Sequence, residues 1–325
     1  MTRRTWLTAV ALLFAVVVLG PRPRVAMPAT PPTLPKELTA LPAWLAEREA
    51  KAGVTDANVA KHITFADSAN PARTPWSVIY LHGFSATRQE TAPVSAEVAR
   101  ALGANLFETR LRGHGLPGDS LAHVTAQDWL ADTQEAFAIA QRLGDSVLVI
   151  GTSTGGTLAV WLATQPPEQQ RGLARLVLIS PNFGPKDRAA EALTLPWAQV
   201  ILPRFIPQRT WKARNDEQTR YWTVSYPSTA LFPMQALVER VRSAYFTTFV
   251  VPTLVFNNHD DQVVDAARTD AWVARARQAT NVPVRQQLVV PTAGEDGHVI
   301  AGRIVAPSQT ATFVQQITDF VRQGR

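Results

Sequence analysis

The sequence contains a serine whose flanking glycines suit nucleophilic catalysis. Gly151, Ser153 and Gly155 form a G-x-S-x-G motif between an apolar run at 146–151 and an Ala/Leu-rich stretch at 155–164. A serine in a sharp strand-to-helix turn needs strained dihedrals, and glycines two residues away on either side remove Cβ atoms that would collide with neighbouring segments. We therefore predict that Ser153 projects above a sheet as a nucleophile. The alternative is a small-residue turn capped by a hydroxyl.

A serine nucleophile needs a base that is oriented by an acid. Of the six histidines, His298 follows the last predicted strand in a glycine-containing loop that can bring an imidazole back over the sheet. We predict that His298 is the base and Asp261, just beyond another strand, the acid. The chain order Ser, Asp, His is the one expected with this type of turn. Asp260 is the main alternative acid, whereas Asp265 is expected near the start of the following helix.

Two backbone N–H groups are predicted to hold the oxyanion of the acyl intermediate. Thr154 follows the serine at a helix N-terminus, where the partial positive charge favours an anion. The sequence H-G-F, which ends at Phe84, closes the strand predicted at 76–83 and is expected to supply the second N–H from Phe84. The Phe84 ring is free to line the acyl pocket, with a plain core role as the alternative, and His82 is expected to support this loop.

Alternating strands and helices must position these residues. Short, mostly apolar runs predict strands at 76–83, 104–111, 146–151, 173–180, 253–258 and 284–290. Strands that are apolar on both faces belong to a parallel sheet covered on both sides. Helical spacing is found at 125–143 and 155–164, and residues 308–323 predict an amphipathic closing helix. We therefore predict an α/β fold with a mostly parallel central sheet and helices on both faces.

The order of the segments predicts five parts along the chain. Between 183 and 247 the strand–helix alternation stops, which indicates a mostly helical cap, or lid, over the carboxyl edge of the sheet, with a packed structural excursion as the alternative. The parts are a signal peptide or membrane anchor at 1–27, a Pro-rich extended linker at 28–45, the first part of the catalytic core at 46–182, the cap at 183–247, and the second part of the core at 248–325.

The N-terminus predicts export. Residues 5–20 are uncharged and mostly apolar and follow a basic pair, as in an export signal or a short anchor. A cut after Ala26 would follow a poor cleavage site, which favours an uncleaved anchor slightly over a cleaved signal peptide. We expect an exported protein that is periplasmic or membrane-anchored and faces outside the cytoplasm.

Composition excludes several classes of function. The net charge is +6, but four arginines within the first 24 residues, where no acid occurs, leave the rest at +2. The body has no clustered basic face, so nucleic acid is not an expected partner. The absence of cysteine excludes disulfides, thiolate zinc sites and a cysteine nucleophile. Neither zinc-ligand spacing nor a phosphate-binding loop is found, so we expect no cofactor or metal.

Together these motifs resemble the α/β-hydrolase superfamily, in the serine-hydrolase group of monoglyceride lipases, lysophospholipases, carboxylesterases and serine aminopeptidase-like proteins. An R-G-H-G loop at 112–115 and the helix with Asp128, Trp129 and Asp132 add to the likeness, which covers 75–181 and 250–325. The resemblance implies the roles predicted above for Ser153, Asp261, His298, Phe84 and Thr154. One departure is Asn258, where the family usually has glycine, and it keeps Asp260 open as the acid.

These features predict a serine hydrolase that cleaves a carboxylic ester, lipid-like or short, through an acyl-enzyme on Ser153. A serine rather than an aspartate nucleophile argues against dehalogenase or epoxide hydrolase chemistry. The cap is rich in aromatic residues, which favours a substrate with an apolar acyl group. These residues are Trp197, Trp211, Tyr221, Trp222, Tyr226 and Phe232. The alternatives are an aminopeptidase, for which Asp216 and Glu217 are the candidate ammonium ligands, an acyltransferase, and a non-catalytic membrane-tethered binding protein. The expected partner is a small-molecule or lipid ester, and the N-terminal segment allows membrane association.

Overall fold

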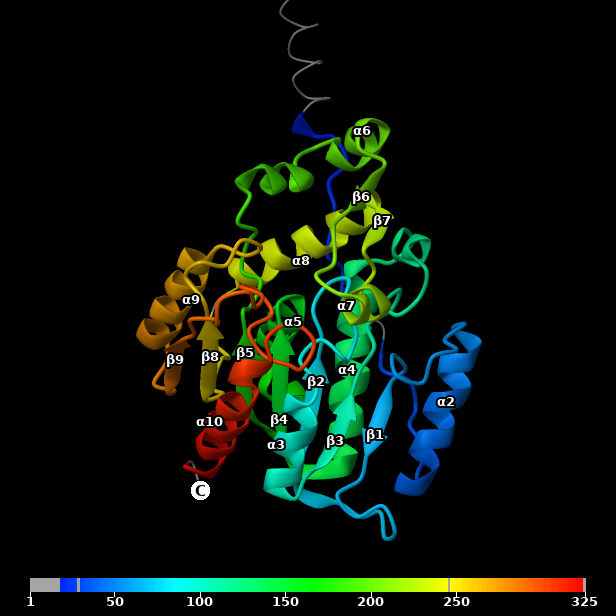
Figure 1. Ribbon diagram of the computed structural model, residues 1–325, viewed down its shortest axis with the longest axis vertical. Coiled ribbons are helices and arrows are strands. Elements are labelled where there is room, and N and C mark those ends of the chain that lie inside the picture. Colours follow the sequence, from blue (N-terminus) through cyan, green and yellow to red (C-terminus); the bar gives the residue numbers. More distant parts are fainter. Residues whose placement is uncertain (1–17, 28–29, 245, 324–325) are drawn as a thin grey trace, which may run out of the picture.

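A seven-stranded sheet forms the centre of the protein in a computed structural model that describes residues 18–27, 30–244 and 246–323 (Figure 1). The strand order is β1-β3-β2-β4-β5-β8-β9. The strands are β1 (His62–Thr64), β2 (Thr74–Leu81), β3 (Asn105–Glu108), β4 (Gly144–Thr152), β5 (Leu173–Ile179), β8 (Thr253–Asn257) and β9 (Val284–Leu288). Only β1 is antiparallel to its neighbour, so the predicted mostly parallel sheet is confirmed. The edge strand β1 was not predicted, because its three residues bury a single side chain.

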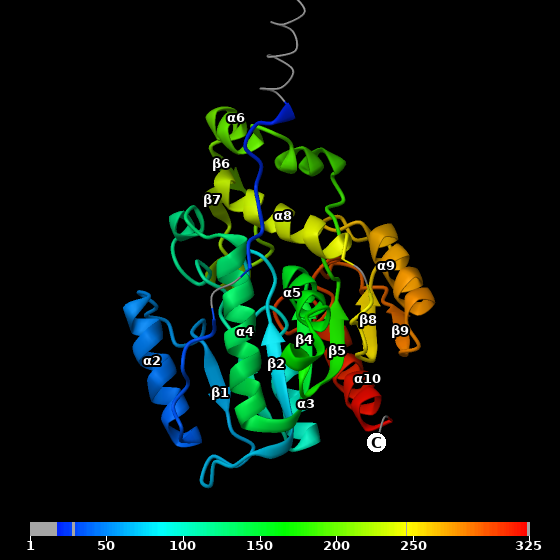
Figure 2. The ribbon, with the colours of Figure 1, turned by 180° about the vertical axis from the view of Figure 1, so that it is seen from behind.

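Helices cover both faces of the sheet, as predicted. The helices are α2 (Leu41–Lys51), α3 (Val94–Leu102), α4 (Ala126–Leu143), α5 (Thr154–Ala163), α9 (Ala266–Ala279) and α10 (Thr310–Arg322). Figure 1 shows α3 and α10 in front of the sheet, and Figure 2 shows α4 and α5 in front of its other face. On β2, Ile79 and Leu81 pack in one core cluster, whereas Val78 and Tyr80 pack in the other. Burial on both faces is why these strands lack polar alternation.

The segment between β5 and β8 lies above the carboxyl end of the sheet (Figure 1). It contains a 3₁₀ helix (Arg188–Thr194), α6 (Ala198–Phe205), β6 (Gln208–Thr210), α7 (Asp216–Tyr221), β7 (Ser225–Pro227), a second 3₁₀ helix (Ser228–Ala230) and α8 (Leu231–Arg242). The antiparallel pair β6-β7 was not part of the mostly helical prediction. All three residues of β6 are exposed, so this strand carries no apolar alternation that a sequence pattern could reveal.

The described linker residues lie against the body of the protein. The Leu34 side chain packs on the main core, as does that of Val25, which lies in the predicted signal or anchor segment. The Arg142 guanidinium donates a hydrogen bond to the Pro35 carbonyl at 3.1 Å. Residues 38–45 of the predicted linker are helical, in a 3₁₀ helix (Leu38–Ala40) and the first part of α2, and are not extended as expected. Apolar side chains of the linker pack against the core and lose contact with water, which the side chains of a fully solvated spacer would not do.

The predicted signal peptide or anchor falls largely on residues 1–17, which lie outside the described residues. Among the residues that are described, no helix combines the length and apolar character needed to cross a membrane.

Candidate active site

Ser153 occupies a strained turn between β4 and α5. Its φ of 51° and ψ of −115° lie in a region that non-glycine residues rarely adopt. A Cβ at Gly155 would lie 2.0 Å from the Leu81 carbonyl oxygen, and one at Gly151 would lie 2.4 Å from the Gly155 carbonyl oxygen. Glycine is therefore required at both positions, because the turn is pressed against β2 and against itself. The G-x-S-x-G motif has the strand-turn-helix setting that was predicted for it.

His298 and Asp261 meet although they are far apart in the sequence. The Nδ1 atom of His298 lies 2.7 Å from Asp261 Oδ2 in a hydrogen bond. The Asp261 side chain is 1% exposed, and its other oxygen accepts the N–H groups of Val263 and Val264 at 2.7 and 3.0 Å. With Nδ1 engaged, the remaining ring nitrogen, Nε2, is the one left for proton transfer.

The two other acids considered have different environments. Asp260 is exposed, and the carboxylate of Asp265 accepts the Ala267 N–H as the N-cap of α9, near the helix start where it was expected. The Asn258 side chain donates to the Gly297 carbonyl at 2.9 Å. Asn258 thereby ties the loop of Asp261 to the loop of His298, so the departure from the family pattern supports the pairing of these two residues.

The protein environment of His298 stabilises its protonated form more than water stabilises a free imidazolium. Burial disfavours the imidazolium, but the negative charge of Asp261 and its hydrogen bond outweigh this, and Asp296 and Glu90 add to the attraction. The pKa of His298 is therefore raised above its ordinary value of 6.5. Since a general base must be neutral, this arrangement shifts the basic form of His298 to higher pH.

A cavity of about 980 Å³ joins Ser153 and His298 to the segment above the sheet. Phe84 and Thr154, the predicted oxyanion donors, line it as well. Its apolar wall comes largely from the segment 183–247, including Leu193, Leu202, Trp211, Trp222 and Tyr226. The Phe84 ring packs edge-on against Tyr226 and His114, with ring centroids 5.1 and 5.8 Å apart, so both its core and its cavity interpretations hold in part.

The other aromatic and acidic residues singled out in the cap lie elsewhere. Tyr221 and Phe232 are buried and Trp197 is half-buried, and none of them lines the cavity among the described residues, in contrast to the three aromatic residues named above. Asp216 and Glu217 begin α7 on the surface, where Glu217 forms an ion pair with Arg303 at 2.5 Å. The candidate ammonium ligands are thus not part of the cavity wall.

Glu90 is a site residue that the sequence did not reveal. Its Oε2 atom accepts the Gly83 N–H at 2.7 Å and the Tyr80 hydroxyl at 3.0 Å, and the residue lines the cavity together with Ser153. Burial raises the pKa of Glu90 from an ordinary 4.5 to about 7, and the hydrogen bond from Gly83 and the charge of His298 offset only part of this. The one sequence signal is an acidic residue in the loop after H-G-F, which alone is too common to indicate a site.

His82 supports the loop, as predicted. It is fully buried, its Nε2 atom accepts the Leu111 N–H at 3.0 Å, and its Nδ1 atom lies 2.9 Å from the Gly83 carbonyl oxygen. Burial, reinforced by neighbouring positive charge, holds the pKa of His82 well below its ordinary value. A neutral imidazole that accepts at Nε2 and donates at Nδ1 fits both contacts.

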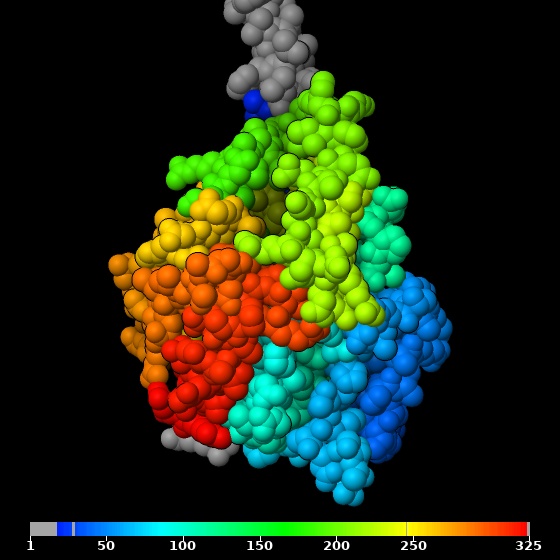
Figure 3. Space-filling view, in the orientation of Figure 1, coloured from blue at the N-terminus to red at the C-terminus, as the bar shows by residue number. Residues whose placement is uncertain are grey.

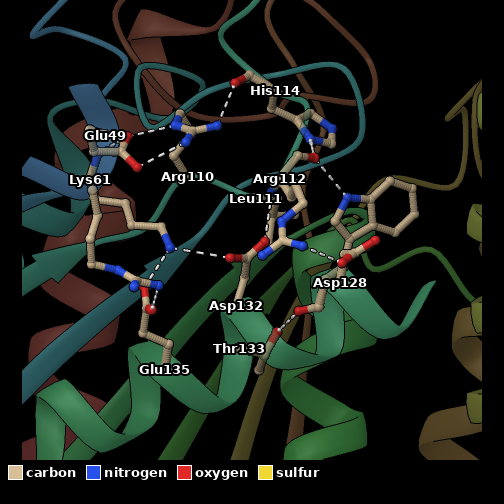
Figure 4. Close-up of polar contacts among 12 residues, drawn as sticks. Glu49, Lys61, Arg110, Leu111, Arg112, His114, Asp128, Asp132, Thr133 and Glu135 are labelled. Carbon is tan, nitrogen blue, oxygen red and sulfur yellow. Dashed lines mark hydrogen bonds and ion pairs between the residues drawn. The ribbon is translucent and has the colours of Figure 1, made fainter. Parts of the chain in front are cut away.

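A buried ionic network positions the loop that precedes α4 (Figure 4). Arg110 forms a two-pronged ion pair with Glu49 of α2, at 2.6 and 2.8 Å, and also donates to the His114 carbonyl at 3.1 Å. The Arg112 N–H donates to Asp132 at 2.6 Å, and Lys61 also contacts this carboxylate at 3.2 Å. His114 in turn packs on Phe84, so the R-G-H-G loop supports the predicted oxyanion residue from outside the cavity.

Comparison with known proteins places this geometry in a family. Residues 72–284, more than half of the chain, match Hydrolase_4, the serine aminopeptidase S33 family. The thermostable monoacylglycerol lipase of Bacillus sp. (strain H-257) is 26% identical over 196 residues, which are 60% of this chain and 74% of that protein. The chain is thus distantly homologous to a lipase and is a lipase- or esterase-like α/β-hydrolase.

Solved structures share the fold. One reported for the metagenome-derived lipolytic enzymes LipS and LipT aligns with a TM-score of 0.63 at 18% identity, over 82% of this chain and 98% of that one. A soluble variant of the monoglyceride lipase of Saccharomyces cerevisiae aligns with a TM-score of 0.59 at 11% identity, over 81% and 91%. A strained Ser153 elbow, a His298–Asp261 pair and a shared cavity occur together on this fold, and the chain belongs to the Hydrolase_4 (serine aminopeptidase, S33) family of α/β-hydrolases.

Proposed function

We propose that the protein is a serine hydrolase that cleaves carboxylic esters. Ser153 Oγ attacks the acyl carbonyl carbon while His298 Nε2 takes the hydroxyl proton, and Asp261 stabilises the resulting imidazolium. The N–H groups of Phe84 and Thr154 receive the oxyanion. The alcohol leaves with the proton from His298, and water then releases the acid by the same steps. The observation that carries this proposal is the 2.7 Å contact between His298 and Asp261 beside a strained serine on one cavity.

The cavity wall favours an ester with an apolar acyl group. A volume of about 980 Å³ is at the upper end of ordinary ligand sites, and apolar side chains, leucines and aromatic residues among them, supply most of the surface of the wall. A relative of this chain is a monoacylglycerol lipase, which supports a lipid-like ester as the substrate class. Polar side chains on the wall, among them Asn182, Arg209 and Lys212, would orient the ester together with the oxyanion donors and the shape of the cavity.

The amide alternative has less support. An aminopeptidase needs a carboxylate that is free to bind an ammonium group, and Asp216 and Glu217 do not line the cavity. Three other carboxylates do line it, and each already has protein partners. One oxygen of Glu90 accepts two hydrogen bonds, Asp296 is paired with Arg214 at 2.8 Å, and Asp187 accepts the Ala189 N–H. Transfer of the acyl group to an alcohol uses the same residues, and it is distinguished by whether added glycerol diverts the product from acid to ester.

A fluorophosphonate probe tests the nucleophile. We expect the full chain to be labelled, Ser153→Ala to lose labelling, and the matched control Ser85→Ala to retain it, since Ser85 lines the same cavity without the elbow. Hydrolysis of p-nitrophenyl esters of graded chain length is then compared with aminoacyl p-nitroanilides. Equal labelling of wild type and Ser153→Ala, or faster anilide cleavage, would contradict the proposed esterase.

We also propose that the chain is exported and held at a membrane by its N-terminal segment. The support is the uncharged run at 5–20 after Arg3 and Arg4. Fractionation of expressing cells, with protease added outside the cytoplasm, tests both location and orientation. Recovery of the intact protein in the cytosol would refute this proposal.

A further inference from the structure

The rim of the cavity carries exposed apolar side chains. Phe205 and Ile206 at the end of α6 are 78% and 44% exposed, Ile201 is 49% exposed, and Leu195 before the helix is 55% exposed. All four also line the cavity above Ser153. Figure 3 shows the molecule hollowed between the two arms of the segment that bears them. We call these four residues the cap rim, and such a concentration of exposed apolar surface marks an interaction site.

The N-terminal chain leaves the described structure beside this rim. The Trp197 N–H, just before α6, donates to the Pro21 carbonyl at 2.9 Å, and Gly20 lies against the Trp197 indole. The described residues begin at Val18, and both ribbon views place this end next to α6 (Figures 1 and 2). The described end of the apolar run, residues 18–20, therefore lies at the cap rim and not at the opposite end of the sheet.

Exposed arginines occur in the segments that form and adjoin the cap rim. Arg22 and Arg24 follow the apolar run, Arg204 lies on α6, and Arg209 lies on β6, all of them exposed. Exposed arginines beside apolar side chains fit the headgroup region of a bilayer with anionic lipids, where each basic residue adds to binding. A soluble protein partner would need a matching acidic and apolar face, but only a bilayer also accounts for the apolar chain segment that arrives at the rim.

We propose that the cap rim docks on the surface of an anionic lipid bilayer, so that the cavity opens toward the membrane. This proposal deepens the proposed function. If the protein is the proposed hydrolase, an ester with an apolar acyl chain would enter from the lipid and reach Ser153 without crossing water, and only this consequence rests on the proposed function. The docking itself follows from the rim, the arginines and the place where the N-terminal chain meets the cap.

The absence of cysteine from the chain allows a direct test. Phe205→Cys in the full chain is labelled with the fluorophore NBD and reconstituted in vesicles of phosphatidylcholine and phosphatidylglycerol. Leu288→Cys is the matched control, because it is an apolar residue, 58% exposed, on the edge strand β9 away from α6. We expect a blue-shifted, brighter emission that lipid-borne nitroxide quenches at position 205, and an aqueous spectrum at position 288.

Several outcomes would overturn the docking. These are an aqueous spectrum at position 205, identical spectra at the two positions, or a blue shift that depends on protein concentration without lipid, which would make the rim a contact between copies. If Phe205→Cys fails to fold, Ile201→Cys replaces it. Fluorophosphonate labelling in the same vesicles reports on Ser153 separately: labelling without docking refutes only this inference, and docking without labelling refutes only the proposed hydrolase.

Discussion

Glu90→Gln should make the protein more stable as the pH rises, relative to wild type. Glutamine keeps an oxygen that can accept from the Gly83 N–H and the Tyr80 hydroxyl, but it removes the ionisable group. Burial raises the pKa of Glu90 from 4.5 to about 7. The carboxyl therefore contributes stability that is fully present below about pH 4.5 and is lost as the pH rises through about 7. The variant has no such loss.

The size of the effect follows from the shift in pKa. About 2.5 units at about 1.4 kcal/mol each give a difference of about 3 kcal/mol between the two ends of the titration. We expect the free energy of unfolding of Glu90→Gln, minus that of wild type, to increase by about this amount between about pH 4 and about pH 8. Any constant effect of the substitution cancels in this comparison, because it is the same at both pH values.

Urea unfolding monitored by tryptophan fluorescence at several pH values measures the difference. Gln89→Ala is the matched control on the same loop, and as an exchange of neutral residues it should change stability equally at every pH. A flat difference between Glu90→Gln and wild type across this range would refute the reasoning. So would a difference that falls with pH, because it would mean that Glu90 is better accommodated charged than neutral.

Further predictions concern the site and its support. Asp261→Asn should lower kcat on a p-nitrophenyl ester by roughly 10⁴-fold with little change in KM, because the imidazole loses its orienting carboxylate. The control Asp260→Asn should keep near-normal kcat, and equal losses in the two variants would contradict the assignment of the acid. The kcat/KM of wild type should rise with pH through a midpoint above 6.5, since His298 acts as the neutral base and its pKa is raised; a midpoint at or below 6.5 would refute this. Glu49→Ala should lower the free energy of unfolding by about 3 to 5 kcal/mol, because it leaves the buried Arg110 without its partner; denaturation that matches wild type would count against this network.

Features encoded in short stretches could be predicted from the sequence. The elbow around Ser153 follows from glycine spacing between an apolar strand and a helix, because collisions with a Cβ act over a few residues. The parallel sheet follows from nearly continuous apolar runs, because burial on both faces removes the alternation. The order of Ser153, Asp261 and His298 reflects the order of the strands that carry them.

Tertiary structure decided what depends on side chains from distant segments. Sequence left Asp260 and Asp261 open, and only the folded loops expose the first carboxylate and bring the second to His298. Glu90 became a site residue because its loop folds back to Gly83, which lies 7 residues earlier, and no sequence pattern marks this turn. The Pro-rich composition of the linker did not indicate that its apolar side chains pack on the core. That packing, like the place of the cap rim, depends on surfaces that exist only after the sheet and its helices assemble.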